Sequence, residues 1–189
     1  MTVALALTVA TVACDRDAAT TGPPAPGNPP ASPTSADQDG GEWVLACVVL
    51  VDADVQSATN GYGTQITVVR HTAEEERTES NGCMSTCWFE LAGRNGAQTL
   101  TAGGMEFRIE ERGADLYFPP HRGEEEVAGL GDGAFWQVRQ PPALLVRKGA
   151  RLYAVQGTVP LIGDRSPAET EEVLREVLLK IARTVLGRV

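Results

Sequence analysis

The stretch AFWQVRQPPALLVRKGARLYAVQGTV, residues 134–159, decides the fold class of this chain. It holds three runs of β-branched, aromatic and aliphatic residues, separated by Gln140-Pro141-Pro142 and by Gly149-Ala150. Such runs are typical of β-strands, and breaks this short let the chain reverse directly, which predicts antiparallel pairing. The expected strands cover residues 134–139, 143–148 and 152–159.

A long amphipathic helix is expected directly after these strands. Ser166 is a good N-cap, Pro167 suits the first helical position, and Glu169 completes a capping box. Apolar residues then recur at helical spacing, with acidic residues near the start and arginines near the end, as the helix dipole favours. They are Leu174, Val177, Leu178, Ile181, Val185 and Leu186. We expect this helix to lie against a sheet, because its polar face mixes both charge signs.

The earlier part of the domain predicts one short helix and further strands. The helix covers residues 53–59, with Asp52 as its cap and Asn60-Gly61 as its end. A strand is expected at 66–70. A hairpin is expected from residues 86–91, through Asn95-Gly96, to residues 98–101.

Residues 105–117 do not decide between strand and helix. Met105, Phe107 and Ile109 alternate as in a strand, whereas residues 106–112 are rich in good helix formers. Strands mixed with helices, with tight turns late in the chain, together predict a single α+β domain. Its antiparallel sheet would carry helices packed on it, including the long C-terminal one.

The N-terminal segment predicts export. Residues 2–13 are uncharged and too few to span a bilayer, and they end in small residues before Cys14, as a cleavable signal does. The segment resembles the bacterial lipobox, whose cysteine receives diacylglycerol and becomes the mature N-terminus. The resemblance implies a signal peptide at 1–13, lipidation of Cys14, and attachment to the extracytoplasmic face of the cell membrane.

The next residues predict a tether. From 14 to 41 the chain is dominated by Pro, Gly, Ala, Ser, Thr and Asp, with too few apolar side chains to offset the entropy of ordering. Residues 42–189 then remain for one globular domain with a substantial core.

The charge of the chain disfavours nucleic acid as a partner. Its formal net charge is −9 at pH 7, and its conspicuous runs, Glu74–Glu76 and Glu124–Glu126, are acidic. Phosphate backbones are bound by clustered Lys and Arg. We interpret both acidic runs as solvated surface.

Three cysteines remain once Cys14 is assigned to lipid, and the residues alone leave their pairing open. A disulfide is natural outside the cytoplasm. One choice joins Cys47 to Cys87; the other joins Cys83 to Cys87 within a C-x3-C motif. That motif also resembles the copper-delivery motif of extracytoplasmic assembly factors, where thiolates select Cu(I).

Signals for catalysis are poor. The two histidines, His71 and His121, lie in no Ser/His/Asp or HExxH pattern, and we expect both to be solvated. The segment Gly129-Leu130-Gly131-Asp132-Gly133 opens onto a strand and not onto a helix, which favours a tight turn over a phosphate loop. We therefore expect no catalytic residue, no metal and no cofactor.

Several segments together resemble a family of small actinobacterial lipoproteins that carry a domain of unknown function. The matching residues are Cys47–Val55, Cys87-Trp88, Gly129–Trp136, Val146–Gly149 and the terminal helix. The resemblance implies a disulfide between Cys47 and Cys87, with Cys83 left as an extra thiol. It supplies no catalytic residue.

Two functions are expected from different classes. The first is a lipid-anchored, non-enzymatic domain that binds a small apolar ligand or an envelope protein, with Trp43, Trp88, Phe135 and Trp136 as candidate contacts or simply core residues. The second is copper handling or disulfide exchange through Cys83 and Cys87.

Overall fold

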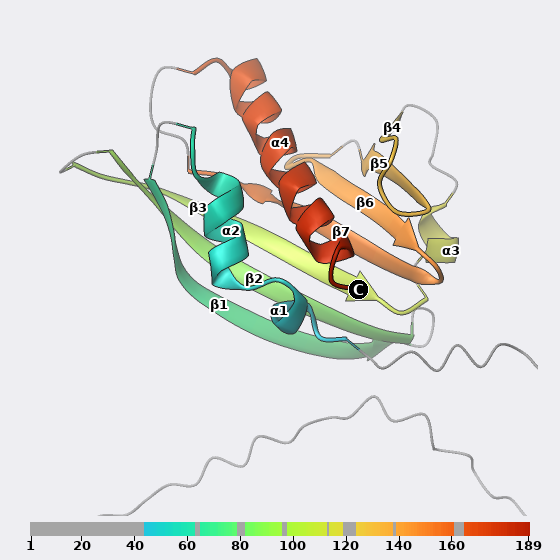
Figure 1. Ribbon diagram of the computed structural model, residues 1–189. Coiled ribbons are helices and arrows are strands. Elements are labelled where there is room, and N and C mark those ends of the chain that lie inside the picture. The colour runs from blue at the N-terminus through green and yellow to red at the C-terminus, as the bar shows by residue number, and fades with distance from the viewer. Residues whose placement is uncertain are drawn as a thin grey trace, which may run out of the picture. The chain divides into compact units, whose positions relative to one another are not determined.

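A computed structural model shows an α+β domain built on one antiparallel sheet, as predicted (Figure 1). It describes residues 44–62, 65–78, 82–95, 98–112, 114–118, 124–137, 139–160 and 165–189. The seven strands lie in the order β1-β2-β3-β7-β6-β5-β4. Residues 44–189 form one compact unit; the expected signal peptide and tether lie outside the described residues.

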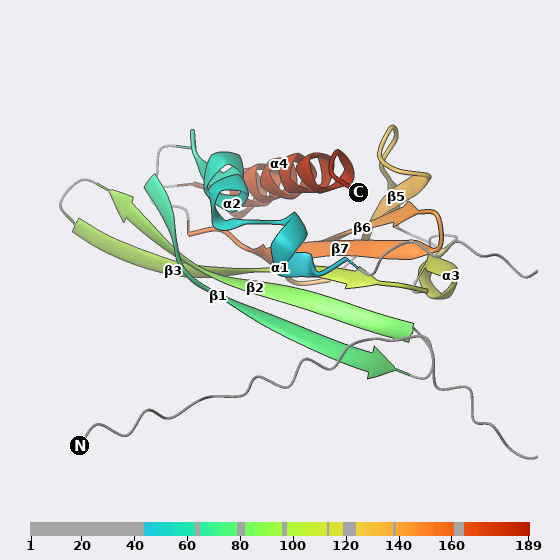
Figure 2. The ribbon, with the colours of Figure 1, turned by 60° about the horizontal axis from the view of Figure 1, so that its bottom comes forward.

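The sheet has two different faces. Helices α1 (Ala46–Val49), α2 (Asp52–Thr59) and α4 (Pro167–Leu186) lie over one of them, here called the helix face (Figure 2). The main core fills the space between these helices and the sheet. The opposite face, here called the second face, carries a smaller cluster formed by Phe135, Leu145, Leu152 and Ala154. Strand side chains therefore alternate between two buried layers at this end of the sheet.

The C-terminal helix is confirmed. It begins at Pro167 after the Ser166 N-cap, whose hydroxyl accepts the backbone N–H of Glu169. The backbone N–H and hydroxyl of Ser166 in turn donate to the Glu169 carboxylate and hold its pKa below the usual range. The apolar stripe is buried against the sheet, because α4 contributes seven buried side chains, all of them apolar.

The late strands are confirmed with small changes at their ends. The structure has β5 (Gly133–Gln137), β6 (Ala143–Lys148) and β7 (Arg151–Thr158), all paired antiparallel. A two-residue strand that the sequence did not predict, β4 (Glu125–Glu126), pairs with β5 at the edge. Part of the second acidic run thus belongs to the sheet.

The early strands are correct in position but much longer than expected. They are β1 (Gln65–Thr78), β2 (Gly82–Asn95) and β3 (Gln98–Glu110), and β2 pairs with β3 as the expected hairpin. Residues 105–110 are therefore strand, and the helix-forming tendency appears only in the single turn of α3 (Ala114–Tyr117). The first acidic run, Glu74–Glu76, is exposed as predicted, but it lies within β1. Because β1 is an end strand of the sheet, charged side chains there discourage pairing with other chains.

The helical start of the domain differs from prediction in two ways. Helix α1 was not expected, because its valines favour strands; here Ala46 and Val49 are buried and the Ala46 N–H donates to Ser85 Oγ over 2.9 Å. Asp52 was predicted to cap α2, but it is the first helical residue, and the Asp54 carboxylate accepts the N–H of Val51 instead. The end at Asn60-Gly61 is confirmed, with Gly61 at φ +101°.

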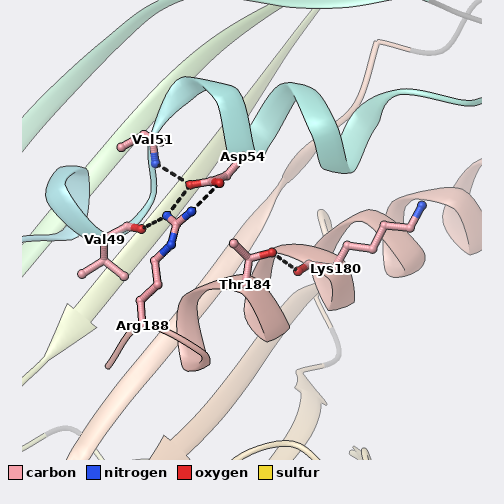
Figure 3. Close-up of polar contacts among 6 residues, drawn as sticks. All are labelled: Val49, Val51, Asp54, Lys180, Thr184 and Arg188. Carbon is pink, nitrogen blue, oxygen red and sulfur yellow. Dashed lines mark hydrogen bonds and ion pairs between the residues drawn. The ribbon is translucent and has the colours of Figure 1, made fainter.

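An ion pair ties this region to the end of α4. The Arg188 guanidinium donates to both carboxylate oxygens of Asp54, at 2.7 Å from Nη2 to Oδ1, and to the Val49 carbonyl at 2.6 Å (Figure 3). These hydrogen bonds lower the pKa of Asp54 and raise that of Arg188. The same carboxylate thus serves the start of α2 and the last residues of the chain.

None of the described helices is sufficiently long and apolar to cross a bilayer.

Candidate functional site

Cys47 and Cys87 form a disulfide, with an S–S length of 2.00 Å and a Cα–Cα distance of 5.1 Å. This confirms the pairing that the family resemblance implied. The bond joins α1 to the middle of β2 across 40 residues of sequence, and Cys87 is fully buried. It holds α1 on the sheet. A helix of only four residues makes few other contacts with the strands.

Cys83 corrects a prediction. It was expected as an extra thiol, but it is disulfide-bonded, and no cysteine among the described residues is free. Cys83 and Cys87 lie four residues apart on the same strand, which separates their Cα atoms by about 13 Å. That is beyond the reach of a disulfide, so the C-x3-C motif does not form a local pair.

The candidate aromatic contacts separate into three environments. Phe135 and Trp136 are 1% and 5% exposed and lie on opposite faces of β5, in the smaller and the main core. The guanidinium carbon of Arg175 lies 5.0 Å from the ring centre of Trp136. Trp88 is 44% exposed, on the second face of β2. Trp43 lies outside the described residues.

His71 is exposed, as predicted, and its Nδ1 lies 2.8 Å from Oδ1 of Asp52. Its ring also contacts Phe89, with the ring centres 6.1 Å apart. His121 lies outside the described residues. The described chain contains no group of three or more His, Cys, Asp or Glu side chains placed to hold a metal ion.

A cavity lies beside the turn that leads into β5, and we call it the turn cavity. Its volume is about 750 Å³, within the range of small-molecule sites. Its lining combines the glycine-rich turn with apolar and charged side chains. The lining residues are Phe118, Glu126, Val127, Ala128, Gly129, Leu130, Gly131, Asp132, Gly133, Ala134 and Arg147.

Glycines give the wall of the turn cavity its conformation. Gly129 and Gly131 have φ of +74° and +60°, values that side-chain-bearing residues rarely adopt, as the tight-turn prediction requires. Leu130 between them is only 4% exposed and anchors the turn in the main core. Gly133 lies opposite Arg147 in the β5–β6 register, and a side chain there would begin to crowd the ring of Phe118. The turn is therefore firmly placed, yet it brings little side-chain bulk into the cavity.

Hydrogen bonds fix the same turn to β6 and to the β6–β7 turn. The Asp132 N–H donates to the Arg147 carbonyl over 2.8 Å. The Asp132 carboxylate accepts the Gly149 N–H over 2.6 Å. Asp132 is thus occupied in holding two turns together.

Arg147 is the residue of the turn cavity that the sequence analysis missed as a site residue. It is half-buried, and its Nε is buried with no hydrogen-bond partner among the described residues. Buried polar groups normally have partners, so an exception calls for an explanation. An arginine that directly follows four apolar residues, 143–146, in a predicted strand is the signal that could have marked it.

The chain matches no protein-family model, no curated protein and no solved structure. The resemblance to actinobacterial lipoproteins therefore stays a prediction from the residues quoted above.

Proposed function

We propose that this protein is a lipid-anchored domain on the extracytoplasmic face of the cell membrane, and that it binds a small ligand in the turn cavity without catalysing a reaction. The observation that carries the proposal is the cavity itself, whose volume of about 750 Å³ suits a small molecule. Its rigid, glycine-rich wall is fastened to β6 and is thus pre-formed. A pre-formed site binds with little loss of conformational entropy.

The layout of the sequence supports the location. A signal-like segment ending at Cys14 and a polar, proline-rich tract precede the domain. A diacylglyceryl group supplies two acyl chains, enough for lasting attachment, and the tract would let the domain stand off the bilayer. The disulfide between Cys47 and Cys87 suits an oxidising compartment.

A small ligand has more support than a protein partner. Among the described residues, the large exposed apolar side chains are Val48, Val51, Val69 and Trp88. Val48 belongs to α1, over the helix face, whereas Trp88 projects from the second face. These four side chains do not form one continuous apolar patch, which a protein partner would favour.

The thiol-based alternative has little support. Copper handling or disulfide exchange needs Cys83 and Cys87 together, but Cys87 is bonded to Cys47 and the Cα atoms of Cys83 and Cys87 lie about 13 Å apart along β2. We therefore prefer the ligand-binding function.

Extraction from membranes under native conditions, followed by mass spectrometry, tests the proposal. We expect a small molecule to accompany the full chain. Ala128→Trp places an indole in the turn cavity and should remove it. Ala150→Trp is the matched control, because residue 150 is also exposed in a turn but does not line the cavity. Equal loading of the two folded variants, or no bound molecule in the unmodified protein, would contradict the proposal.

A further inference from the structure

The charge environment of Arg147 differs from that of four other arginines in the domain. Carboxylates lie within salt-bridge distance of Arg70, Arg108, Arg175 and Arg188. Within the described part of the chain, no ion pair or hydrogen bond involves the Arg147 side chain. Its positive charge is therefore left without a partner at a half-buried position.

Arg108 is an arginine on the same face of the sheet that has a carboxylate beside it. Its side chain points to the second face from β3, and its Nε lies 2.9 Å from a carboxylate oxygen of Glu110. The Nε atoms of both arginines are buried without a hydrogen bond, but of the two only Arg108 has a carboxylate within salt-bridge distance among the described residues. The difference lies in the partner, since the two guanidinium groups are chemically the same.

The acidic residues of the turn cavity do not replace that partner. Asp132 directs a carboxylate oxygen to the Gly149 N–H. Glu126 lines the cavity from an exposed position in the edge strand β4. Phe118 supplies apolar surface near the same space. Among the described lining residues, the cavity thus combines a cation that has no ion pair with the apolar ring of Phe118.

Building on the proposed function, we infer that the ligand is an anionic amphiphile, a molecule with a carboxylate or phosphate group beside an apolar portion. Its anionic group accepts hydrogen bonds from Arg147, and its apolar portion lies against Phe118. A planar guanidinium suits either oxyanion, because its N–H groups can donate in parallel to two oxygens. Charge-assisted hydrogen bonds of this kind are strong where water is partly excluded.

Calorimetric titration with three ten-carbon probes tests the inference. The probes are decanoate, decyl phosphate and decanol, each at monomeric concentrations and with the full chain in mild detergent. We expect at least one anion to bind the unmodified protein about tenfold or more tighter than decanol, the range for one charge-assisted hydrogen bond. The two anions show whether the site favours a carboxylate or a phosphate.

Variants assign the effect to one side chain. Arg147→Gln should remove the preference for the anion, and Arg147→Lys should restore part of it, because the charge returns without the planar fork. Arg139→Gln is the matched control, since residue 139 is exposed and does not line the turn cavity. Thermal unfolding of each variant checks that it is folded.

The outcomes separate the inference from the function on which it rests. Decanol binding as tightly as both anions, or an anion preference unchanged in folded Arg147→Gln, overturns the anionic assignment and leaves the cavity as a ligand site. Failure of all three probes to bind the unmodified protein overturns the inference and the proposed function together.

Discussion

Asp132 donates its backbone N–H to the carbonyl oxygen of Arg147 over 2.8 Å. This bond joins the glycine-rich turn to β6, the strand that carries Arg147, whose side chain has no ion pair within the described part of the chain. The backbone of Arg147 thus positions the wall of the cavity, while its side chain supplies the charge. Changes in the turn should consequently affect both stability and binding.

The glycine at position 131 tests this coupling. In Gly131→Ala the new Cβ would lie too close to the Arg147 carbonyl and 2.8 Å from Val146 Cγ1, at a φ of +60°. We expect a loss of about 3 kcal/mol in the free energy of unfolding, from left-handed strain and overpacking together. Gly129→Ala is the control, because its φ is +74° but no atom lies within 4 Å of the new Cβ. It should cost only the strain, about 1–2 kcal/mol, in urea unfolding. Equal losses in the two variants would mean that the turn is not held against β6.

The disulfide between Cys47 and Cys87 should contribute strongly to stability. It closes a loop of 40 residues, for which loop-closure entropy gives about 4 kcal/mol. The double variant Cys47→Ala/Cys87→Ala should unfold at a correspondingly lower urea concentration. Reductant should shift the unfolding of the unmodified protein in the same direction. The double variant has already lost this bond, so reductant cannot remove its contribution a second time. A double variant as stable as the oxidised protein would contradict this expectation.

The ion pair between Asp54 and Arg188 predicts a pH dependence. Its hydrogen bonds lower the pKa of Asp54 below the ordinary value of 3.8. The stabilisation is therefore present above the unfolded-state pKa and is lost as the pH falls through the lower, folded-state pKa. Asp54→Asn should lower the urea midpoint at pH 7, and its difference from the unmodified protein should shrink in acid.

An exposed acidic residue of α4 supplies the control for this measurement. Glu172→Gln removes a carboxylate that lies open to solvent, so we expect little change at either pH. A difference between Asp54→Asn and the unmodified protein that stays constant from neutral to strongly acidic pH would contradict the assigned ion pair.

Lipid attachment predicts a labelling pattern that also bears on the cysteines. In a bacterial host with a lipoprotein pathway, radiolabelled palmitate should mark the unmodified chain and Cys83→Ala but not Cys14→Ala. The chain has four cysteines and Cys47 is bonded to Cys87, so within one chain a lipidated Cys14 cannot also be the disulfide partner of Cys83. Intact mass before and after alkylation would count the cysteines that lie outside disulfides and thioethers. An unlabelled, freely dissolved protein would contradict the anchor.

The sequence predicted those parts of the fold whose causes are local. The capping box around Ser166 and the turn at Gly129 and Gly131 follow from the chemistry of a few neighbouring residues, and both are confirmed. The extent of β1 was missed, because Glu74–Glu76 suggests solvent and not strand. At the edge of a sheet a segment can be a strand and still carry exposed charges, because its backbone pairs with one neighbouring strand while its side chains stay in solvent.

Long-range packing explains what the sequence did not predict. Alternation in residues 105–110 suggests one buried face of β3, yet Glu106 and Glu110 on the other face are buried as well. Arg147 becomes a site residue only because β5 pairs with β6 and brings the glycine-rich turn beside it. No pattern within residues 143–148 specifies that neighbour.

Nuclear magnetic resonance of the full chain during titration with decanoate tests the central claim most directly, because the Nε–H of Arg147 reports on its own partner. We predict a saturable shift of that resonance, with matching shifts of the amides from Gly129 to Gly133. The Nε–H resonance of Arg108, which already lies beside Glu110, should stay in place. An unchanged Arg147 resonance at saturation, or shifts confined to residues around exposed Trp88, would contradict ligand binding in the turn cavity.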